Sequence, residues 1–426
     1  MADSVTHPAT NASGEGQTGR YHREIPYRWE VVAMLWCAYF LFQADKQIYS
    51  VVLPPLRGEL GLSGYEAGLV STIFTLVVAM FSPLAGALGD RFQRHRTLIL
   101  SVGIWSAGTA LVGAANSFAV LLLLRSIVTS GAESFYPPVS HAYLAEQHTR
   151  TRALAISIHQ TAQYAGPIGS GFLAGWIAEQ FGWRYSFVIF GLAGVLLSIW
   201  MALRMKHTTE SRLASGEALL AGFAHCFRLD GVRRIGFAFA AVLFVTIGYN
   251  TWAPTIFGEM FGLSLSQAGF QTAFWSSVCA MVGALLGGWL SDRFARTGRS
   301  RFDLQAAALA LAAPFLWLLG TAQTLPLALA ALGAVGFFRG IYEGTIAVTL
   351  YDFVAPRYRA SAAAVVLLLA NLLASPSSAA LGWIADHADL NQAVSGLSVF
   401  FVVGAAILFS ARKLPHESVS LAATSE

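Results

Sequence analysis

Long apolar runs, separated by short polar connections, follow one another through almost the whole chain. The first of them, "WEVVAMLWCAYFLFQADKQIYSVVL", covers residues 29–53. We count about twelve runs long enough to cross the hydrocarbon core of a bilayer. Because hydrocarbon offers no partner to a free backbone amide, each run predicts a helix. The pattern therefore predicts an all-α membrane protein with twelve transmembrane helices.

Composition supports this prediction. Of the 426 residues, 55% are hydrophobic and 12% are charged, and the mean hydropathy is +0.57, which is unlike an ordinary soluble domain. Residues 1–27 are polar and lack the apolar core of a secretory signal, so we expect a disordered cytoplasmic tail. Cys37, Cys226 and Cys279 show no spacing typical of a metal site or a disulfide framework, and we expect neither metal nor cofactor.

The basic residues are distributed unevenly between the two sides of the predicted bundle. Lys46, Arg125 and Arg339 fall inside apolar runs, and Arg57 and Arg184 follow odd-numbered runs. All other lysine and arginine residues lie in the tails or in connections after even-numbered runs. The positive-inside rule then places both termini in the cytoplasm, with a bacterial-type inner or plasma membrane as the expected location. It also explains the pI of about 9.0 without a nucleic-acid partner.

Three pairs of segments recur in the same order at a distance of about 200 residues, which indicates a duplicated unit. The pairs are "LSGYEAG" (62–68) with "LSLSQAG" (263–269), "GALGDRFQRHR" (86–96) with "GGWLSDRFARTGRSR" (287–301), and "AGWIA" (174–178) with "LGWIAD" (381–386). A duplicated six-helix unit is typical of secondary transporters.

The repeat divides the chain into five parts. We predict a tail at 1–27, an N-terminal six-helix half at 28–204, a central cytoplasmic loop at 205–232, a C-terminal six-helix half at 233–412 and a tail at 413–426.

The D-R-F-x-R segment after the second run resembles the loop signature of the major facilitator superfamily, and its weaker copy follows the eighth run, as in that family. The resemblance covers about residues 27–412. Within the superfamily the chain is similar to the spinster-like transporters and to the organic anion:cation symporters. The resemblance implies two halves that rock about a central site, and a monomer.

Charged residues inside the first and fourth runs are the main functional candidates, because a charge in the membrane is costly and is functional by default. Asp45 and Lys46 point about 100° apart on a helix, so each needs a partner elsewhere. The helical rise puts Asp45 and Arg125 at matching depth, which predicts a contact between them. Lys46 then either faces the cavity or reaches toward Glu133.

In the symporters that this chain resembles, an acid and a base in helix one and an Arg followed by Glu in helix four form the proton-coupling site. The resemblance therefore implies proton coupling through Asp45, Arg125 and Glu133. Two departures stand out: Lys46 replaces the usual Arg, and the segment "SGAES" displaces Glu133 by one residue, or about 100° on an α-helix. The alternative is a static charge network that holds helices one and four together.

In the second half, Arg339 and Glu343 form an i, i+4 pair that either neutralises itself or binds substrate. Polar residues on the spans are predicted to line the cavity, although such side chains also bond helices together. The predicted substrate-binding residues are Lys46, Arg125, Gln160, Tyr164, Asn250, Arg339, Tyr342 and Asn371. We expect His141 and His159 to be packing residues.

The loop motif and its copy imply a gate. In the family, the acid and the arginine of this loop hold the cytoplasmic ends of helices together. The predicted gating residues are Asp90, Arg91, Arg94, Asp292 and Arg293. The alternative is that these charges only set topology, which does not account for an acid in both copies.

The sequence thus predicts a proton-coupled secondary transporter, most simply a symporter of a small carboxylate or sugar acid, with small molecules, protons and lipid as its partners. The alternatives are spinster-like transport of lysolipids or amphipathic compounds, or proton-coupled drug export. Phosphate-binding loops, nucleophile elbows and metal-spaced clusters are absent from the sequence, so an enzyme is not expected. A channel needs no rocking interface, and the duplicated halves argue against it.

Overall fold

The computed structural model describes residues 27–89, 93–148, 150–206, 216–297 and 299–412, and within these ranges all regular structure is helical. The predicted all-α fold is confirmed. Nine of the described helical spans are long and apolar enough to cross a membrane by length and composition. The remaining three, α1, α4 and α8, carry more polar residues, and α1 and α8 place theirs toward the middle of the molecule.

The first six spans form one half of the molecule. Their helices are α1 (Tyr27–Val51) with the short α2 (Leu53–Leu60), α3 (Gly64–Gly89), α4 (Arg94–Val112), the interrupted fourth span, α8 (Arg152–Phe181) and α9 (Trp183–Arg204). The fourth span consists of α5 (Phe118–Leu121), the π-helix η1 (Leu122–Thr129), α6 (Ser130–Glu133) and α7 (Tyr136–Gln147).

The connection contains α10 (Gly216–Arg228), and the second half follows it. Its helices are α11 (Asp230–Phe261), α12 (Leu265–Arg296), α13 (Arg301–Thr321), α14 (Leu325–Phe353), the eleventh span with η2 (Pro356–Tyr358), α15 (Arg359–Ala374) and α16 (Ser377–His387), and the twelfth span with α17 (Leu390–Gly396) and α18 (Ser398–Ala411).

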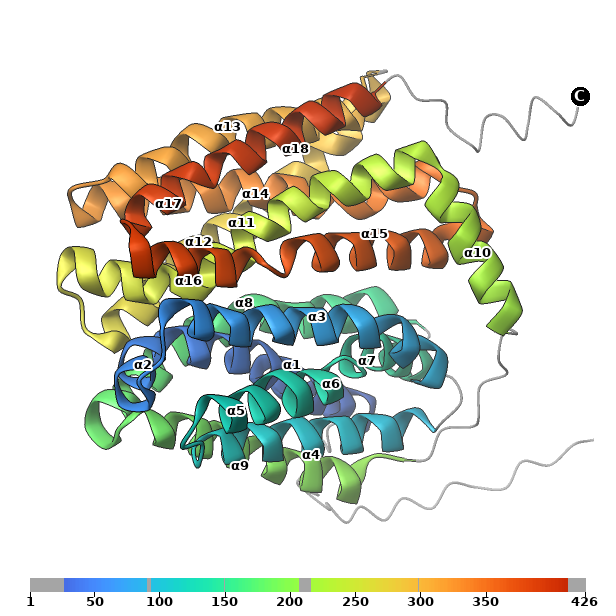
Figure 1. The fold of residues 1–426 in the computed structure, drawn as a ribbon. Coiled ribbons are helices and arrows are strands. Elements are labelled where there is room, and N and C mark those ends of the chain that lie inside the picture. The colour runs from blue at the N-terminus through green and yellow to red at the C-terminus, as the bar shows by residue number, and fades with distance from the viewer. Residues whose placement is uncertain (1–26, 90–92, 149, 207–215, 298, 413–426) are drawn as a thin grey trace, which may run out of the picture.

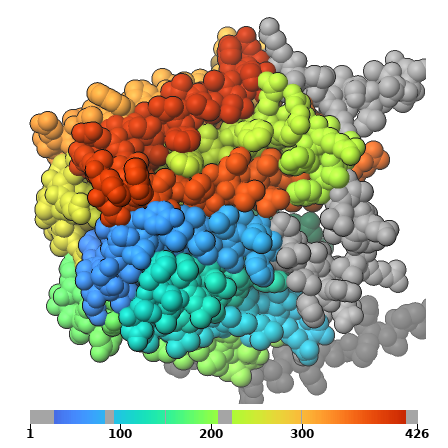
Figure 2. Space-filling view, in the orientation of Figure 1, coloured from blue at the N-terminus to red at the C-terminus, as the bar shows by residue number. Residues whose placement is uncertain are grey.

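The two halves lie one above the other, with the first half below and the second above in Figure 1, and α10 passes between them at one end. Figure 2 shows the same division as two bands of colour that meet along the middle of the molecule. Helix α3 packs against α15 and α16, and α8 packs against α12. We call the end of the bundle that contains α2 the α2 end, and the opposite one the termini end.

The turns that begin α3 and α12 at the α2 end are built alike, which explains the first repeated segment. Gly61 and Gly262 end the preceding helices with φ of +62° and +65°, a conformation that glycine adopts without strain. Ser63 and Ser264 then cap the next helix, each in a reciprocal capping box with the residue three positions later. The repeat therefore encodes a helix start.

Small residues let the halves approach closely at the α2 end. Gly64 faces the backbone of Gly382, and Gly171 faces the backbone of Gly269. A Cβ atom at any of these positions would overlap the backbone of the other half. Close backbone packing of this kind is how helices associate tightly in lipid. Between described residues, the hydrogen bonds that join the halves also lie at or near this end.

Candidate functional site

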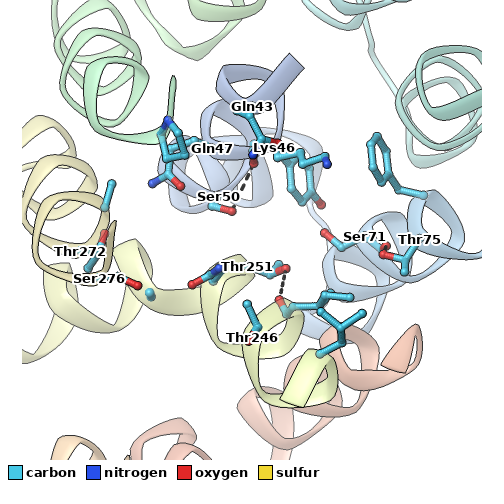
Figure 3. A pocket seen from close by; sticks show the side chains of 18 of the residues that line it. Gln43, Lys46, Gln47, Ser50, Ser71, Thr75, Thr246, Thr251, Thr272 and Ser276 are labelled. Atoms are coloured by element: carbon cyan, nitrogen blue, oxygen red, sulfur yellow. Dashed lines mark hydrogen bonds between the residues drawn. The ribbon is translucent and has the colours of Figure 1, made fainter. Parts of the chain in front are cut away.

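A cavity of about 410 Å³ lies between the halves. Helices α1, α3, η1 and α8 line it from the first half, and α11, α12, α14 and α15 line it from the second. Figure 3 shows hydroxyl and amide side chains from both halves around it. The polar lining includes Gln43, Lys46, Gln47, Ser50, Ser71, Thr75, Arg125, Gln163, Tyr164, Thr246, Asn250, Thr251, Thr272, Ser276, Ser277, Arg339, Glu343 and Asn371.

The predicted contact between Asp45 and Arg125 is present. An Nη atom of Arg125 donates to Oδ2 of Asp45, and Nη2 donates to the Asp45 carbonyl oxygen at 3.2 Å. Thr109 donates to the other carboxylate oxygen at 2.8 Å. Asp45 and Arg125 are only 2% and 4% exposed, and the guanidinium also lies over the ring of Phe74 at 4.5 Å. The pair thus ties α1 to the fourth span deep inside the first half.

Glu133 is completely buried, and neither of its carboxylate oxygens has a hydrogen-bond partner among the described residues. The charged groups that act on it are Asp45, Lys46 and Arg125. An ionised carboxylate without donors is costly in such a place unless a cation lies close by. The free-energy cost of ionising Glu133 therefore depends on how the neighbouring charges are arranged.

The path of the fourth span decides where Glu133 points. The segment η1 is a π-helix, in which each hydrogen-bonded turn joins residues i and i+5 and so holds one residue more than an α-helical turn. Within it, the Thr129 hydroxyl donates a hydrogen bond to the Leu124 carbonyl, five residues earlier. Glu133 follows Arg125 by eight residues, which on a regular α-helix would set it about 80° away. The extra residue offsets most of this rotation. The expected displacement of Glu133 assumed a regular α-helix, which the span does not have.

Lys46 lies on the cavity wall and is exposed to it (Figure 3). Its ammonium group stands 4.1 Å from the centre of the Phe42 ring, and no carboxylate of the described residues is within ion-pair distance. Of the two predicted positions, the structure shows the one that faces the cavity.

Arg339 and Glu343 line the cavity from the other side. Nε of Arg339 lies 3.7 Å from Oε1 of Glu343 on the same helix, and Nη2 is 3.5 Å from the Ser276 hydroxyl. Their side chains are 14% and 30% exposed, so this pair is wetter than the Asp45–Arg125 pair. The predicted i, i+4 pairing is present.

The other predicted substrate-binding residues divide into two groups. Tyr164, Asn250 and Asn371 line the cavity, and their role in binding stays a prediction. Gln160 and Tyr342 do not line it. Gln160 faces His141 of α7 at 3.4 Å, and Tyr342, about 100° around the helix from Glu343, is fully buried in helix packing.

Sequence reasoning missed several cavity residues that a simple pattern indicates. Gln43, Lys46, Gln47 and Ser50 recur at intervals of three and four, which places them on one face of α1. A polar face within an apolar span is the signal that could have identified Gln43 and Gln47. His159, by contrast, packs as expected, because its ring stacks on Tyr39 at 4.7 Å.

The predicted gating residues are only partly placed. Asp90 and Arg91 lie outside the described residues. Arg94 forms an ion pair with Glu146 of its own half. Asp292 lies 3.8 Å from Arg301, and the guanidinium of Arg293 lies 5.7 Å from the ring of Trp289. Each of these contacts lies within one half, that of Arg94 in the first and those of Asp292 and Arg293 in the second. The gating role stays a prediction.

Comparison with known proteins identifies the family and similar transporters. The model of the Major Facilitator Superfamily matches residues 35–379. A probable sulfoacetate transporter of Cupriavidus necator is 28% identical over 66% of this chain and 68% of its own length. A probable galactarate/D-glucarate transporter of Bacillus subtilis is 27% identical over 64% and 66%. The cis,cis-muconate transport protein of Acinetobacter baylyi is 26% identical over 85% and 87%.

Solved structures show the same fold. A bacterial homolog of the human lysosomal transporter spinster, in an inward-facing and unoccupied conformation, matches with a TM-score of 0.81 at 22% identity, over 92% of this chain and 98% of that one. A nucleoside transporter matches with a TM-score of 0.75 at 13% identity, over 90% and 100%. At these identities the likeness is one of architecture.

Proposed function

The chain belongs to the Major Facilitator Superfamily, and from this premise we propose that it is a symporter that carries a small organic anion together with protons. It is a multi-pass membrane transporter and not an enzyme. The finer assignment to an anion and to protons is argued below from the cavity.

The observation that carries the anionic substrate is the position of Lys46. Arg125 and Arg339 are both paired with carboxylates, whereas Lys46 faces the cavity without one among the described residues. A carboxylate or sulfonate would supply the missing counter-charge. The relatives described above are named for acids of this kind, namely sulfoacetate, galactarate or glucarate, and muconate.

The proposed coupling uses the buried charges beside Lys46. Protonation of Asp45 weakens its ion pair with Arg125, and protonation of Glu133 removes a negative charge that acts on Lys46 from beyond ion-pair distance. The substrate anion then competes for these cations. Breaking a buried ion pair by removing one charge costs about 3–5 kcal/mol, which is enough to make the two events depend on each other. Glu133 fits this role because none of the described residues donates a hydrogen bond to its carboxylate.

Alternating access follows from the two halves around one cavity. The distribution of basic residues supports cytoplasmic termini, so the α2 end would face the outside. In that orientation the described contacts between the halves close the outer side, and the substrate would leave toward the cytoplasm.

The test is uptake by proteoliposomes that hold a pH-sensitive dye, with sulfoacetate, D-glucarate, cis,cis-muconate and lysophosphatidylcholine as substrates. We expect at least one acid to drive proton entry through the wild type. Asp45→Asn should abolish the proton signal, and Asp389→Asn, which changes a surface carboxylate that only caps α17, should not. If lysophosphatidylcholine moves and no acid carries protons, the chain transports amphipathic compounds, as the spinster-like alternative holds.

A further inference from the structure

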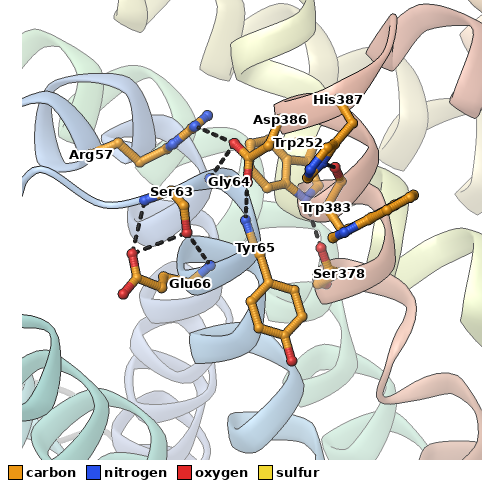
Figure 4. A network of polar contacts seen from close by, with 10 residues as sticks. All are labelled: Arg57, Ser63, Gly64, Tyr65, Glu66, Trp252, Ser378, Trp383, Asp386 and His387. Carbon is orange, nitrogen blue, oxygen red and sulfur yellow. Dashed lines mark hydrogen bonds and ion pairs between the residues drawn. The ribbon is translucent and has the colours of Figure 1, made fainter.

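Asp386 at the end of α16 binds the first turn of α3 across the interface between the halves. Its carboxylate accepts hydrogen bonds from the backbone N–H groups of Gly64 at 2.6 Å and Tyr65 at 2.8 Å (Figure 4). Arg57 adds a longer contact at 3.4 Å. The first N–H groups of a helix have no acceptor within the helix, so the carboxylate supplies the hydrogen-bond acceptor that they would otherwise lack.

Glu179, near the end of α8, makes the corresponding contact in the opposite direction. One carboxylate oxygen accepts from the Ser266 N–H at 2.7 Å, and the other accepts from the Ser266 hydroxyl at 3.2 Å. Ser266 lies in the first turn of α12. An acid of the first half thus binds a helix start of the second, as Asp386 of the second half binds a helix start of the first.

The duplicated sequence explains why the two contacts match. "GWIAE" (175–179) and "GWIAD" (382–386) occupy the same place in the two halves, and the bound helix starts lie in the repeated pair "LSGYEAG" and "LSLSQAG". Within that pair, Tyr65 corresponds to Ser266. Neither the cavity nor the proposed proton site accounts for these repeats.

Each repeat combines a glycine with an acid four residues later, and both are needed. Gly382 and Gly175 lie against the backbone of Gly64 and Ser266, where a side chain would not fit. Residues four apart lie on the same face of a helix, so the acid reaches the N–H groups just beyond this close contact. A negative charge at a helix N-terminus is further stabilised by the helix dipole.

We propose that Glu179 and Asp386 are a matched pair of interdomain caps that hold the two halves together at the α2 end. In a transporter that opens alternately on its two sides, both caps must release before the α2 end can open. Their strength therefore sets how often that end is open. This role goes beyond the proposed function and does not depend on which substrate is carried.

The experiment measures the distance between the halves at the α2 end. Spin labels are placed on cysteines that replace the exposed residues Tyr185 of the first half and Gln392 of the second, after the native cysteines have been replaced. The distance distribution is recorded in nanodiscs without substrate. We expect the long-distance population to rise about threefold in Glu179→Gln and in Asp386→Asn, and about tenfold in the double variant, because exposed charge contacts are individually weak.

Asp389→Asn is the matched control. Asp389 lies three residues beyond Asp386 but caps α17 within its own half, so its neutralisation should leave the distances unchanged. Size-exclusion profiles identify variants that do not fold, and a conservative Asp386→Glu variant should then restore the short distance. Wild-type distances in the double variant, or an equal shift in Asp389→Asn, would overturn the proposal. Neither result bears on anion transport, which is measured separately.

Discussion

The fourth and tenth spans both carry an arginine and a glutamate, yet they hold them in different ways. The fourth span is broken into α5, η1, α6 and α7, and Arg125 pairs with Asp45 on another helix. The tenth span, α14, is one continuous helix of 29 residues, and Arg339 pairs with Glu343 one turn away.

This difference separates two kinds of charge pair. A pair within one helix moves with that helix and keeps its geometry when the halves rearrange. A pair between helices changes whenever those helices shift, and here an acid that accepts no hydrogen bond from a described residue lies buried in the same half. Burial strengthens the contrast, because the interaction between two charges grows as water is excluded. The first half is thus suited to link charge with movement, and the second to present a fixed surface to a substrate.

The largest difference is expected when the two arginines are removed. Arg125→Ala leaves Asp45 buried without its partner, which should cost about 3–5 kcal/mol of stability and abolish transport. Arg339→Ala removes one charge of a partly exposed pair and should cost about 1 kcal/mol or less. Thermal unfolding in detergent, together with uptake, measures both. Equal losses in the two variants would show that the two pairs do not differ in this way.

A deletion tests the interruption of the fourth span directly. Ile127 lies in η1 and is 47% exposed. Its removal should convert η1 to α-helix while Arg125 and Glu133 keep a common face. We therefore expect the deletion to lower the free energy of unfolding by no more than about 1 kcal/mol.

The matched control is deletion of Ala330, an exposed residue of the regular α14. Here the helix has no extra residue to lose, and everything beyond the deletion rotates by about 100°. Gly336 and Gly340, which lie against the backbone of α12, would be turned away from it, and folded protein should be lost. Yield by size exclusion and the unfolding temperature distinguish the two deletions. If both are equally harmful, η1 does not carry an extra residue that the span can lose.

Sequence reasoning went far where simple geometry applies. The fold and the contact between Asp45 and Arg125 followed from run lengths and from the constant rise of a helix. The π-helix did not, because the segment "LLLRSIVT" gives no local signal for it. Gln160 and Tyr342 were misplaced for a related reason. A span surrounded by both protein and lipid is apolar on most faces, so its pattern does not tell which polar residue faces the cavity.

A smaller effect is expected on substrate affinity. Lys46→Gln removes the cation that has no carboxylate within ion-pair distance among the described residues. The KM for the anion should rise at least about tenfold, since a hydrogen bond to a charged group contributes about 1.5–3 kcal/mol. Arg339→Gln should raise it about threefold, because Glu343 already neutralises that arginine. Initial rates of uptake over a range of concentrations measure both. A larger change for Arg339→Gln would move the anion site to the second half.

The smallest expected effect is on the pH dependence of stability, and it concerns a difference between the halves at the α2 end, away from the cavity. Glu59 in α2 accepts hydrogen bonds from Trp183 at 2.6 Å and Arg184 at 2.8 Å, and these bonds lower the pKa of its carboxyl group. In the repeat, Met260 of the second half stands at the matching position and cannot make such a contact.

A lowered pKa in the folded state means that Glu59 stabilises the first half above the ordinary glutamate pKa of about 4.3, and that this contribution is lost as the pH falls below it. Because Glu59 is half exposed, its own contribution to the change in unfolding temperature between pH 6 and pH 3 should be no more than about 2 °C. Glu59→Gln should remove that part of the pH dependence. Glu259→Gln, a neutralisation near the matching place in the second half, should leave the curve parallel to that of the wild type. Identical curves for Glu59→Gln and the wild type would mean that this contact adds nothing to the difference between the halves.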